Sequence, residues 1–289
     1  MKNSAASIRI RLNNLAKKEN IDFQIILIRY LHERFLYRLS NSSSSHNFFL
    51  KGGTLLYAIE GIKTRPTIDI DFLAVQIPNE IDVIKNTFVE ICKIQFTDDG
   101  VWFESNSISA EIITENNKYN GVRIYIQSGF DTIRQRLQID IGFGDVFITK
   151  PQQLHFPVLL NEMQVPVINA YSLETVIAEK FHAMIELSTI NSRMKDFYDV
   201  YKLILQGDFD NDILQKSIIA TFKNRNTNYI KDHALFTDEF SNSPNRQKAW
   251  NSFLNKINIQ QKIPFHEIMI TLKEILYPIW VKIEYVLVP

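Results

Sequence analysis

Two spacings of apolar residues alternate along the chain and predict its elements. Apolar residues three to four positions apart predict helices in the first half of the chain over 4–19, 22–40, 54–61 and 80–94. After residue 172 every predicted element is a helix, including segments over 212–223, 245–257 and 265–283. Gly61 is the expected stop of the helix that precedes it, and Ser172 is the expected N-cap of the helix that follows it.

A spacing of two predicts strands between the helices of the first half. Such strands are expected over 68–75, 107–114, 122–127 and 136–143. In the first of them Ile68, Ile70 and Phe72 share one face. Asp69 and Asp71 therefore share the other face.

Two carboxylates on one face of an otherwise apolar strand indicate a cation site. Asp69 and Asp71 would repel each other, and burying them without a counter-charge is unfavourable. Mg2+ takes oxygen ligands from one or two carboxylates and completes its shell with substrate phosphates and water. Upstream, Gly52 and Gly53 would let backbone N–H groups approach a phosphate without an intervening side chain. Taken alone, the D-x-D and the Gly-Gly pair are each a weak signal. Glycosyltransferases also use a D-x-D, and a Gly-Gly pair is often an ordinary turn.

The composition is that of an ordinary globular protein and excludes several kinds of site. Of the 289 residues, 45% are hydrophobic and 22% are charged, and the formal net charge is zero, so no global field indicates nucleic acid. The single cysteine, Cys92, excludes an internal disulfide and a cysteine-rich metal site. No apolar run approaches the ~20 residues that span a bilayer, and the N-terminus lacks an apolar signal segment. We therefore expect a cytoplasmic protein with no membrane partner.

The order of Gly-Gly, short helix and Asp-Ile-Asp resembles the DNA polymerase β-type nucleotidyltransferase superfamily. The longer match, LKGGT over 50–54 followed by RPTIDIDF over 65–72, resembles its AbiEii/AbiGii (MenT-like) toxin branch. The resemblance implies an α+β fold with a polymerase β-type core, made of a small mixed sheet with flanking helices, plus a C-terminal helical bundle. We expect the core with the N-terminal helices over 1–150, and a helical domain that contributes to the nucleotide site over 151–289. The proline-rich segment 151–166 is expected to be a packed connector.

A second block, in the predicted helices after residue 172, also resembles this branch. It consists of Glu179-Lys180-Phe181-His182 followed by Arg193-x-Lys195-Asp196-x-x-Asp199. From pattern alone, Lys180 is equally well a snorkelling lysine at the edge of an apolar stripe. Likewise, Arg193 and Asp196 alone would make an ordinary surface ion pair. In the toxins that the block resembles, the lysine and the Lys-Asp motif face the nucleotide, which leaves Asp196 and Asp199 as candidates for the essential carboxylate.

The resemblance implies a role for each of the marked residues. The expected catalytic residues are Asp69, Asp71, Asp140, Lys180 and Asp196. The expected ligands of Mg2+ or Mn2+ are Asp69, Asp71 and Asp140. The expected nucleotide-binding residues are Gly52, Gly53, Thr54, Thr67, Arg193 and Lys195. Asp140 is chosen because a third carboxylate lies on a later strand in this fold. Asp145 competes with it, but it follows Gly144 and is better explained as a turn residue.

These assignments imply a nucleotidyltransferase that moves NMP from an NTP to an acceptor hydroxyl. In the family the acceptor is often the 3′ end of a tRNA, and the activity is that of the toxin in a type IV-like toxin–antitoxin system, which acts in abortive infection and phage defence. The expected protein partner is a winged-helix antitoxin. NMP transfer to a protein or a small molecule is an alternative. A non-catalytic nucleotide- or RNA-binding module is disfavoured because every expected charged position is filled. A glycosyltransferase is disfavoured because it would leave the Gly-Gly pair and the second block without a role.

Overall fold

The computed structural model describes residues 5–115, 119–148, 152–259 and 262–287. Contacts group the chain into two units, of which the first comprises Met1–Gly144 and Pro151–Tyr171 and the second comprises Asp145–Lys150 and Ser172–Pro289. The boundary predicted between 150 and 151 lies outside the described residues. The predicted division into two domains stays a prediction.

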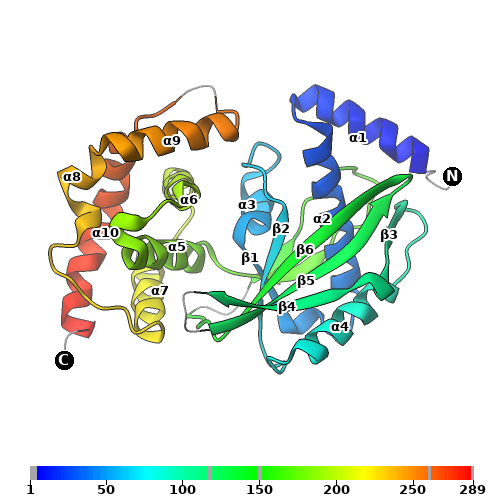
Figure 1. Ribbon diagram of the computed structural model, residues 1–289, viewed down its shortest axis with the longest axis horizontal. Helices are drawn as coiled ribbons and strands as arrows, with labels where there is room; N and C mark the ends of the chain where they lie inside the picture. Colours follow the sequence, from blue (N-terminus) through cyan, green and yellow to red (C-terminus); the bar gives the residue numbers. More distant parts are fainter. Residues whose placement is uncertain (1–4, 116–118, 149–151, 260–261, 288–289) are drawn as a thin grey trace. The chain divides into compact units, whose positions relative to one another are not determined.

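The first unit is built on a mixed sheet of eight strands within the described residues (Figure 1). The strand order is β3-β5-β6-β2-β1-β8-β7, and β4 pairs with β5. The pairs β1–β8 and β2–β6 are parallel, and the others are antiparallel. The strands are β1 (Phe48–Lys51), β2 (Asp69–Ala74), β3 (Val101–Phe103), β4 (Ser109–Glu115), β5 (Tyr119–Phe130), β6 (Ile133–Phe143), β7 (Gln152–His155) and β8 (Val167–Ala170). The helices of this unit are α1 (Ala5–Glu19), α2 (Phe23–Ser40), α3 (Gly52–Glu60) and α4 (Ile81–Lys93).

An aromatic cluster fixes which way β2 faces. Phe72 of β2 packs edge to face on Phe48 of β1, and Phe48 packs in the same way on Phe88 of α4. Phe48, Phe72 and Phe88 are fully buried. Because side chains alternate along a strand, burying Phe72 turns Asp69 and Asp71 to the opposite face of the sheet.

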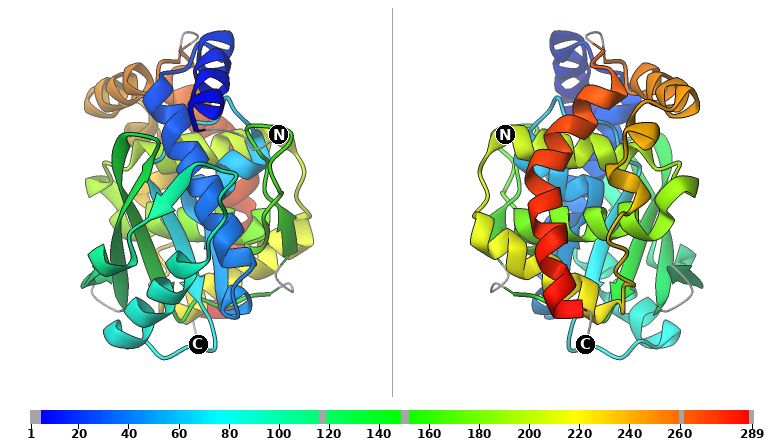
Figure 2. Two further views of the ribbon diagram at one scale, coloured as in Figure 1. Left: turned by 90° about the vertical axis from the view of Figure 1, so that its right-hand side faces the viewer. Right: turned by 90° about the vertical axis from the view of Figure 1, so that its left-hand side faces the viewer.

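The second unit, from Ser172 onward, is helical in its described residues. Its helices are α5 (Leu173–Leu187), α6 (Met194–Gln206), α7 (Asn211–Asn224), α8 (Asp238–Ser241), α9 (Pro244–Lys256) and α10 (Phe265–Leu287). The long helix α10, seen along its length in the right-hand view of Figure 2, contacts α6, α7, α8 and α9. Phe181 of α5, Phe222 of α7 and Trp280 of α10 contact one another in the core. Nowhere in the described part of the chain does a helix combine the length and the apolar character needed to cross a membrane.

Most predicted elements are present, and the mixed α+β class is confirmed. The Ser172 side chain accepts a hydrogen bond from the Thr175 N–H as the N-cap of α5, and Gly61 ends α3 with a φ of 79°. The strands β1, β3, β7 and β8 were not predicted. Two of them, β7 and β8, lie where the apolar, proline-rich segment begins and just after it ends. The polymerase β-type core and the helical bundle stay predictions.

Candidate active site

Three carboxylates meet where β2 and β6 run side by side. The two strands are parallel, and Asp71 of β2 is the register partner of Asp140 of β6. Asp69 precedes Asp71 by two residues and so lies on the same face. One oxygen atom from each of the three carboxylates lies within 4.8 Å of the others, and all three residues are half-buried. The strand register thus brings together the three acidic residues that the sequence marks as metal ligands.

This triad has the chemistry of a site for a hard divalent cation. Three negative charges at this separation repel one another, and a bound cation would offset that repulsion. All three donors are carboxylate oxygens, which suit Mg2+ and Mn2+. The residues therefore fit a metal, and Asp69, Asp71 and Asp140 are the ones that would hold it.

The glycine pair at the start of α3 leaves room for these carboxylates. Gly52 has a φ of 67°, a conformation that favours glycine. A Cβ atom at Gly52 would lie 1.8 Å from Oδ2 of Asp71, and a Cβ atom at Gly53 would lie 2.5 Å from Oγ1 of Thr67. Steric contact with Asp71 and Thr67 therefore explains the need for glycine at both positions without any ligand. Their expected contact with phosphate stays a prediction.

Two threonines hold the backbone and side chain of Asp69, and a histidine contacts one of these threonines. The Thr67 hydroxyl donates to Oδ1 of Asp69 at 2.7 Å. The Thr54 hydroxyl donates to the Asp69 carbonyl at 2.9 Å and lies 3.3 Å from Nδ1 of His32. Nε2 of His32 lies 3.3 Å from the carbonyl of Ile68. Because the Thr54 hydroxyl is buried in these contacts, a phosphate contact from Thr54 would fall to its backbone N–H. No spacing in the sequence indicated His32, whose partners lie on segments distant in the chain.

His32 is expected to make stability depend on pH. Burial lowers the pKa of His32 from 6.5 to about 4, against smaller upward effects of the Asp69 carboxylate and the Ile68 carbonyl. Between these values the unfolded chain binds a proton that the folded chain does not, so stability is lost as the pH falls. Relative to His32→Gln, we expect the unfolding free energy of the wild type to fall by about 3 kcal/mol from about pH 7 to about pH 4. Urea unfolding of both proteins in EDTA measures this difference, and a difference that does not change with pH would contradict the prediction.

An arginine that the sequence did not indicate binds the third carboxylate. Arg123 of β5 is the register partner of Asp140. Its Nε donates to Oδ1 of Asp140 and its Nη2 donates to Oδ2, both at 2.7 Å. Gln138 Nε2 also donates to Oδ1, at 3.2 Å. The hydrogen bond to Asp140 raises the pKa of the Arg123 guanidinium above its usual value, so this cation stays charged. Both oxygens of Asp140 therefore have a partner from within the chain.

The alternative third carboxylate, Asp145, has a different environment. It belongs to the second unit and lies 2.9 Å from Nη2 of Arg225, which also lies 3.4 Å from Oε1 of Glu179. The cluster of carboxylates in the first unit contains Asp140 and does not contain Asp145. The geometry thus favours Asp140 as the third member.

A second group of charges lies between α5 and α6 of the second unit. Nζ of Lys180 lies 3.0 Å from Oδ1 of Asp196 and 2.7 Å from Oδ2 of Asp199. Nε of Arg193 lies 2.7 Å from Oδ2 of Asp196. The side chains of Asp196 and Asp199 are 0% and 1% exposed. Lys180 is therefore the shared counter-ion of two buried carboxylates, which excludes both a snorkelling lysine and an ordinary surface ion pair.

The charges of this group keep Asp196 ionised. Burial alone would raise the pKa of Asp196, but the nearby charges of Lys180 and Arg193 outweigh burial and lower the pKa below its usual value. Lys195 is exposed and has a weaker effect in the same direction. Because Lys180 binds both carboxylates, the geometry does not distinguish Asp196 from Asp199 as the essential carboxylate.

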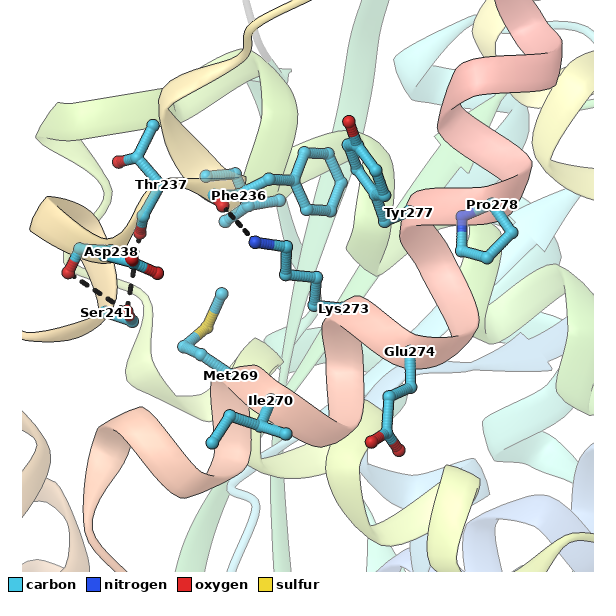
Figure 3. Close-up of a pocket in the computed structure, with 11 residues that line it drawn as sticks. Phe236, Thr237, Asp238, Ser241, Met269, Ile270, Lys273, Glu274, Tyr277 and Pro278 are labelled. Carbon is cyan, nitrogen blue, oxygen red and sulfur yellow. Dashed lines mark hydrogen bonds between the residues drawn. The ribbon is translucent and has the colours of Figure 1, made fainter.

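A pocket in the second unit contains none of the predicted site residues. It has a volume of about 360 Å3 and is lined by residues of α8, α10 and the segment before α8. Nζ of Lys273 donates to the carbonyl of Phe236 at 2.8 Å, beside the ring of Tyr277 (Figure 3). Its lining has neither the carboxylate cluster nor the glycines that the predicted chemistry requires.

Comparison with known proteins identifies the family. No curated protein matches the chain. A crystal structure of JHP933 from Helicobacter pylori has 17% sequence identity and a TM-score of 0.46, covering 89% of this chain and 94% of that chain. A second H. pylori crystal structure has 16% identity and a TM-score of 0.43, covering 88% of this chain and 93% of that chain. The family model of the AbiEii nucleotidyl transferase toxins of type IV toxin–antitoxin systems matches residues 34–269, well over half of the chain. The chain therefore belongs to the AbiEii family of nucleotidyl transferase toxins.

Proposed function

We propose that the protein transfers a nucleoside monophosphate from an NTP to the 3′-terminal hydroxyl of a tRNA. A bond forms between the acceptor oxygen and the α-phosphorus, and the bond from the α-phosphorus to the bridging oxygen breaks. Pyrophosphate leaves with the electron pair. The observation that supports this reaction most is the Asp69, Asp71 and Asp140 triad beside the glycine pair, in a chain of a nucleotidyl transferase family.

The first unit would carry the reacting groups. Asp69, Asp71 and Asp140 would hold Mg2+ or Mn2+, which when bound neutralises phosphate charge and lowers the pKa of the attacking hydroxyl. Asp140 also helps to take up the proton of that hydroxyl. Gly52 and Gly53 begin α3, so that backbone N–H groups at this end of the helix are available to the triphosphate.

For the second unit we propose a role in balancing phosphate charge. Lys180 acts as a point cation, and Asp196 orients its ammonium group through the contact of 3.0 Å. Arg193 and Lys195 add positive charge for phosphate or RNA contacts. These roles rest on the resemblance of the second sequence block to the toxin family.

The biological setting follows from the same resemblance. We propose that NMP transfer blocks the tRNA end and arrests growth as a toxin. A winged-helix antitoxin is the proposed partner. Abortive infection during phage attack is the proposed role.

A labelling experiment tests the reaction and its acceptor together. The purified protein is incubated with Mg2+, total bacterial RNA and each of the four α-labelled NTPs in turn. The control is a matched preparation of the variant that carries both Asp69→Ala and Asp71→Ala. We expect label in a tRNA-sized band, lowered at least about 100-fold in the control because the phosphate charge is no longer neutralised.

The other outcomes separate the alternatives. Label on protein or on a small molecule would keep the chemistry and replace the acceptor. Binding of NTP without any transfer would overturn the transferase and favour a nucleotide- or RNA-binding module.

A further inference from the structure

The row of charges across the sheet extends past the triad to two residues on the neighbouring strands. Asp71 of β2 pairs in register with Asp140 of β6, Asp140 pairs with Arg123 of β5, and Arg123 pairs with Glu111 of β4. Residues paired in register share a face of the sheet. Arg123 thus has a carboxylate as its direct neighbour on each side.

Arg123 and a metal would compete for the same carboxylate. Both oxygens of Asp140 accept hydrogen bonds from Arg123 at 2.7 Å, and Oδ1 also accepts one from Gln138. One of these oxygens is the atom that Asp140 contributes to the triad. A metal bound there would share the oxygens of Asp140 with the guanidinium and lie close to its positive charge, and both effects oppose metal binding.

A second acceptor for Arg123 is already within reach. Nη1 of Arg123 lies 3.8 Å from Oε1 of Glu111, which accepts a hydrogen bond from the Tyr125 hydroxyl at 3.1 Å. The Arg123 side chain is 29% exposed and that of Glu111 is 52% exposed, so solvent gives the guanidinium room to turn. Rotation of the Arg123 side chain alone would therefore exchange Asp140 of β6 for Glu111 of β4 as its partner.

We propose that Arg123 is a two-position gate on the metal site, bound to Asp140 without metal and to Glu111 when Asp140 binds metal. The inference rests on the proposed use of a divalent cation by the triad. A fixed anchor, which would hold Asp140 in the geometry that the metal needs, is the opposing interpretation. The two interpretations predict opposite effects of removing Arg123 on metal affinity. Loss of a gate strengthens metal binding, and loss of an anchor weakens it.

Titration of the full chain with Mn2+ distinguishes the two interpretations. Free Mn2+ is followed by electron paramagnetic resonance, without nucleotide. We expect Arg123→Gln to lower the Mn2+ dissociation constant at least about fivefold. We expect Glu111→Gln to raise it about two- to fivefold, because the neutral amide oxygen attracts the guanidinium less strongly than the carboxylate does. The variant with both substitutions should match Arg123→Gln, since Glu111 acts only through Arg123.

The controls keep the test decisive. Arg9→Gln removes an exposed ion pair of the same unit, to Asp131, and should leave the dissociation constant unchanged. If Arg123→Gln does not fold, Arg123→Lys replaces it, because lysine keeps the charge and lacks the fork that binds both oxygens. It should also bind Mn2+ more tightly than the wild type.

The outcomes also separate this inference from the proposed function. An unchanged or raised dissociation constant for Arg123→Gln, with Mn2+ bound by the wild type and lost in Asp71→Asn, overturns the gate alone. If the wild type does not bind Mn2+, the gate and the proposed metal use both fail. The expected shifts without label on any RNA, protein or small molecule would leave the gate standing and overturn the transferase.

Discussion

Replacing Lys180 with methionine is expected to destabilise the second unit by about 3–5 kcal/mol. The substitution removes the cation that lies within 3.0 Å of Asp196 and within 2.7 Å of Asp199. Both carboxylates are buried, so neither can regain the lost interaction from water. Asp196 keeps Arg193 as a partner, which limits the loss at that carboxylate. Urea unfolding followed by tryptophan fluorescence measures the loss, because the buried Trp250 and Trp280 both lie in this unit.

Two further variants test the cause of this loss. Lys282→Met removes an exposed lysine of the same unit, and we expect its unfolding free energy to stay within about 0.5 kcal/mol of the wild type. Adding Asp196→Asn and Asp199→Asn to Lys180→Met removes the two buried negative charges and should recover most of the loss. A Lys180→Met protein as stable as the Lys282→Met control would contradict the buried ion cluster. Because a less stable variant has a smaller folded fraction, NMP transfer by Lys180 variants must be compared at equal folded fractions.

The sequence pattern predicted the helices better than the sheet. The predicted helices over 22–40 and 80–94 match α2 and α4 closely, because each carries an apolar stripe long enough to be unambiguous. The strand β1 was missed although it lies inside the sheet. All four of its residues, Phe48–Lys51, are buried, so they show no alternation. The strands β7 and β8 have only four residues each, which is too short for a reliable period.

The residues of the site were also predicted only where the pattern within a single element was sufficient. The spacing of two along one strand predicted that Asp69 and Asp71 lie together. His32 and Arg123 were missed because their roles depend on contacts between distant segments. Arg123 alternates with buried Val122 and Ile124, and only the register of β5 with β6 places it opposite Asp140. Pairing across strands was not available from the spacing within any one of them.

Replacing Gly52 with alanine is expected to lower NMP transfer at least about 100-fold in protein that still folds. The new Cβ atom would lie 1.8 Å from Oδ2 of Asp71 and 2.5 Å from its Cγ. The carboxylate must therefore move away from the position in which its oxygens lie within 4.8 Å of those of Asp69 and Asp140. We expect Mn2+ affinity to fall together with transfer, because the displaced atom is one of the proposed ligands.

A matched substitution at the other end of α3 separates this displacement from backbone strain. Gly61 also has a positive φ, of 79°, but a Cβ atom there would meet nothing within 4 Å. Gly61→Ala and Gly52→Ala should both lose stability, by about 1–3 kcal/mol of backbone strain. Only Gly52→Ala should lose Mn2+ binding. If transfer falls while Mn2+ affinity stays at the wild-type value, the glycine acts on the triphosphate and not on Asp71. Equal losses of Mn2+ affinity in both variants would instead assign the effect to the strained helix ends, because Gly61 displaces no carboxylate.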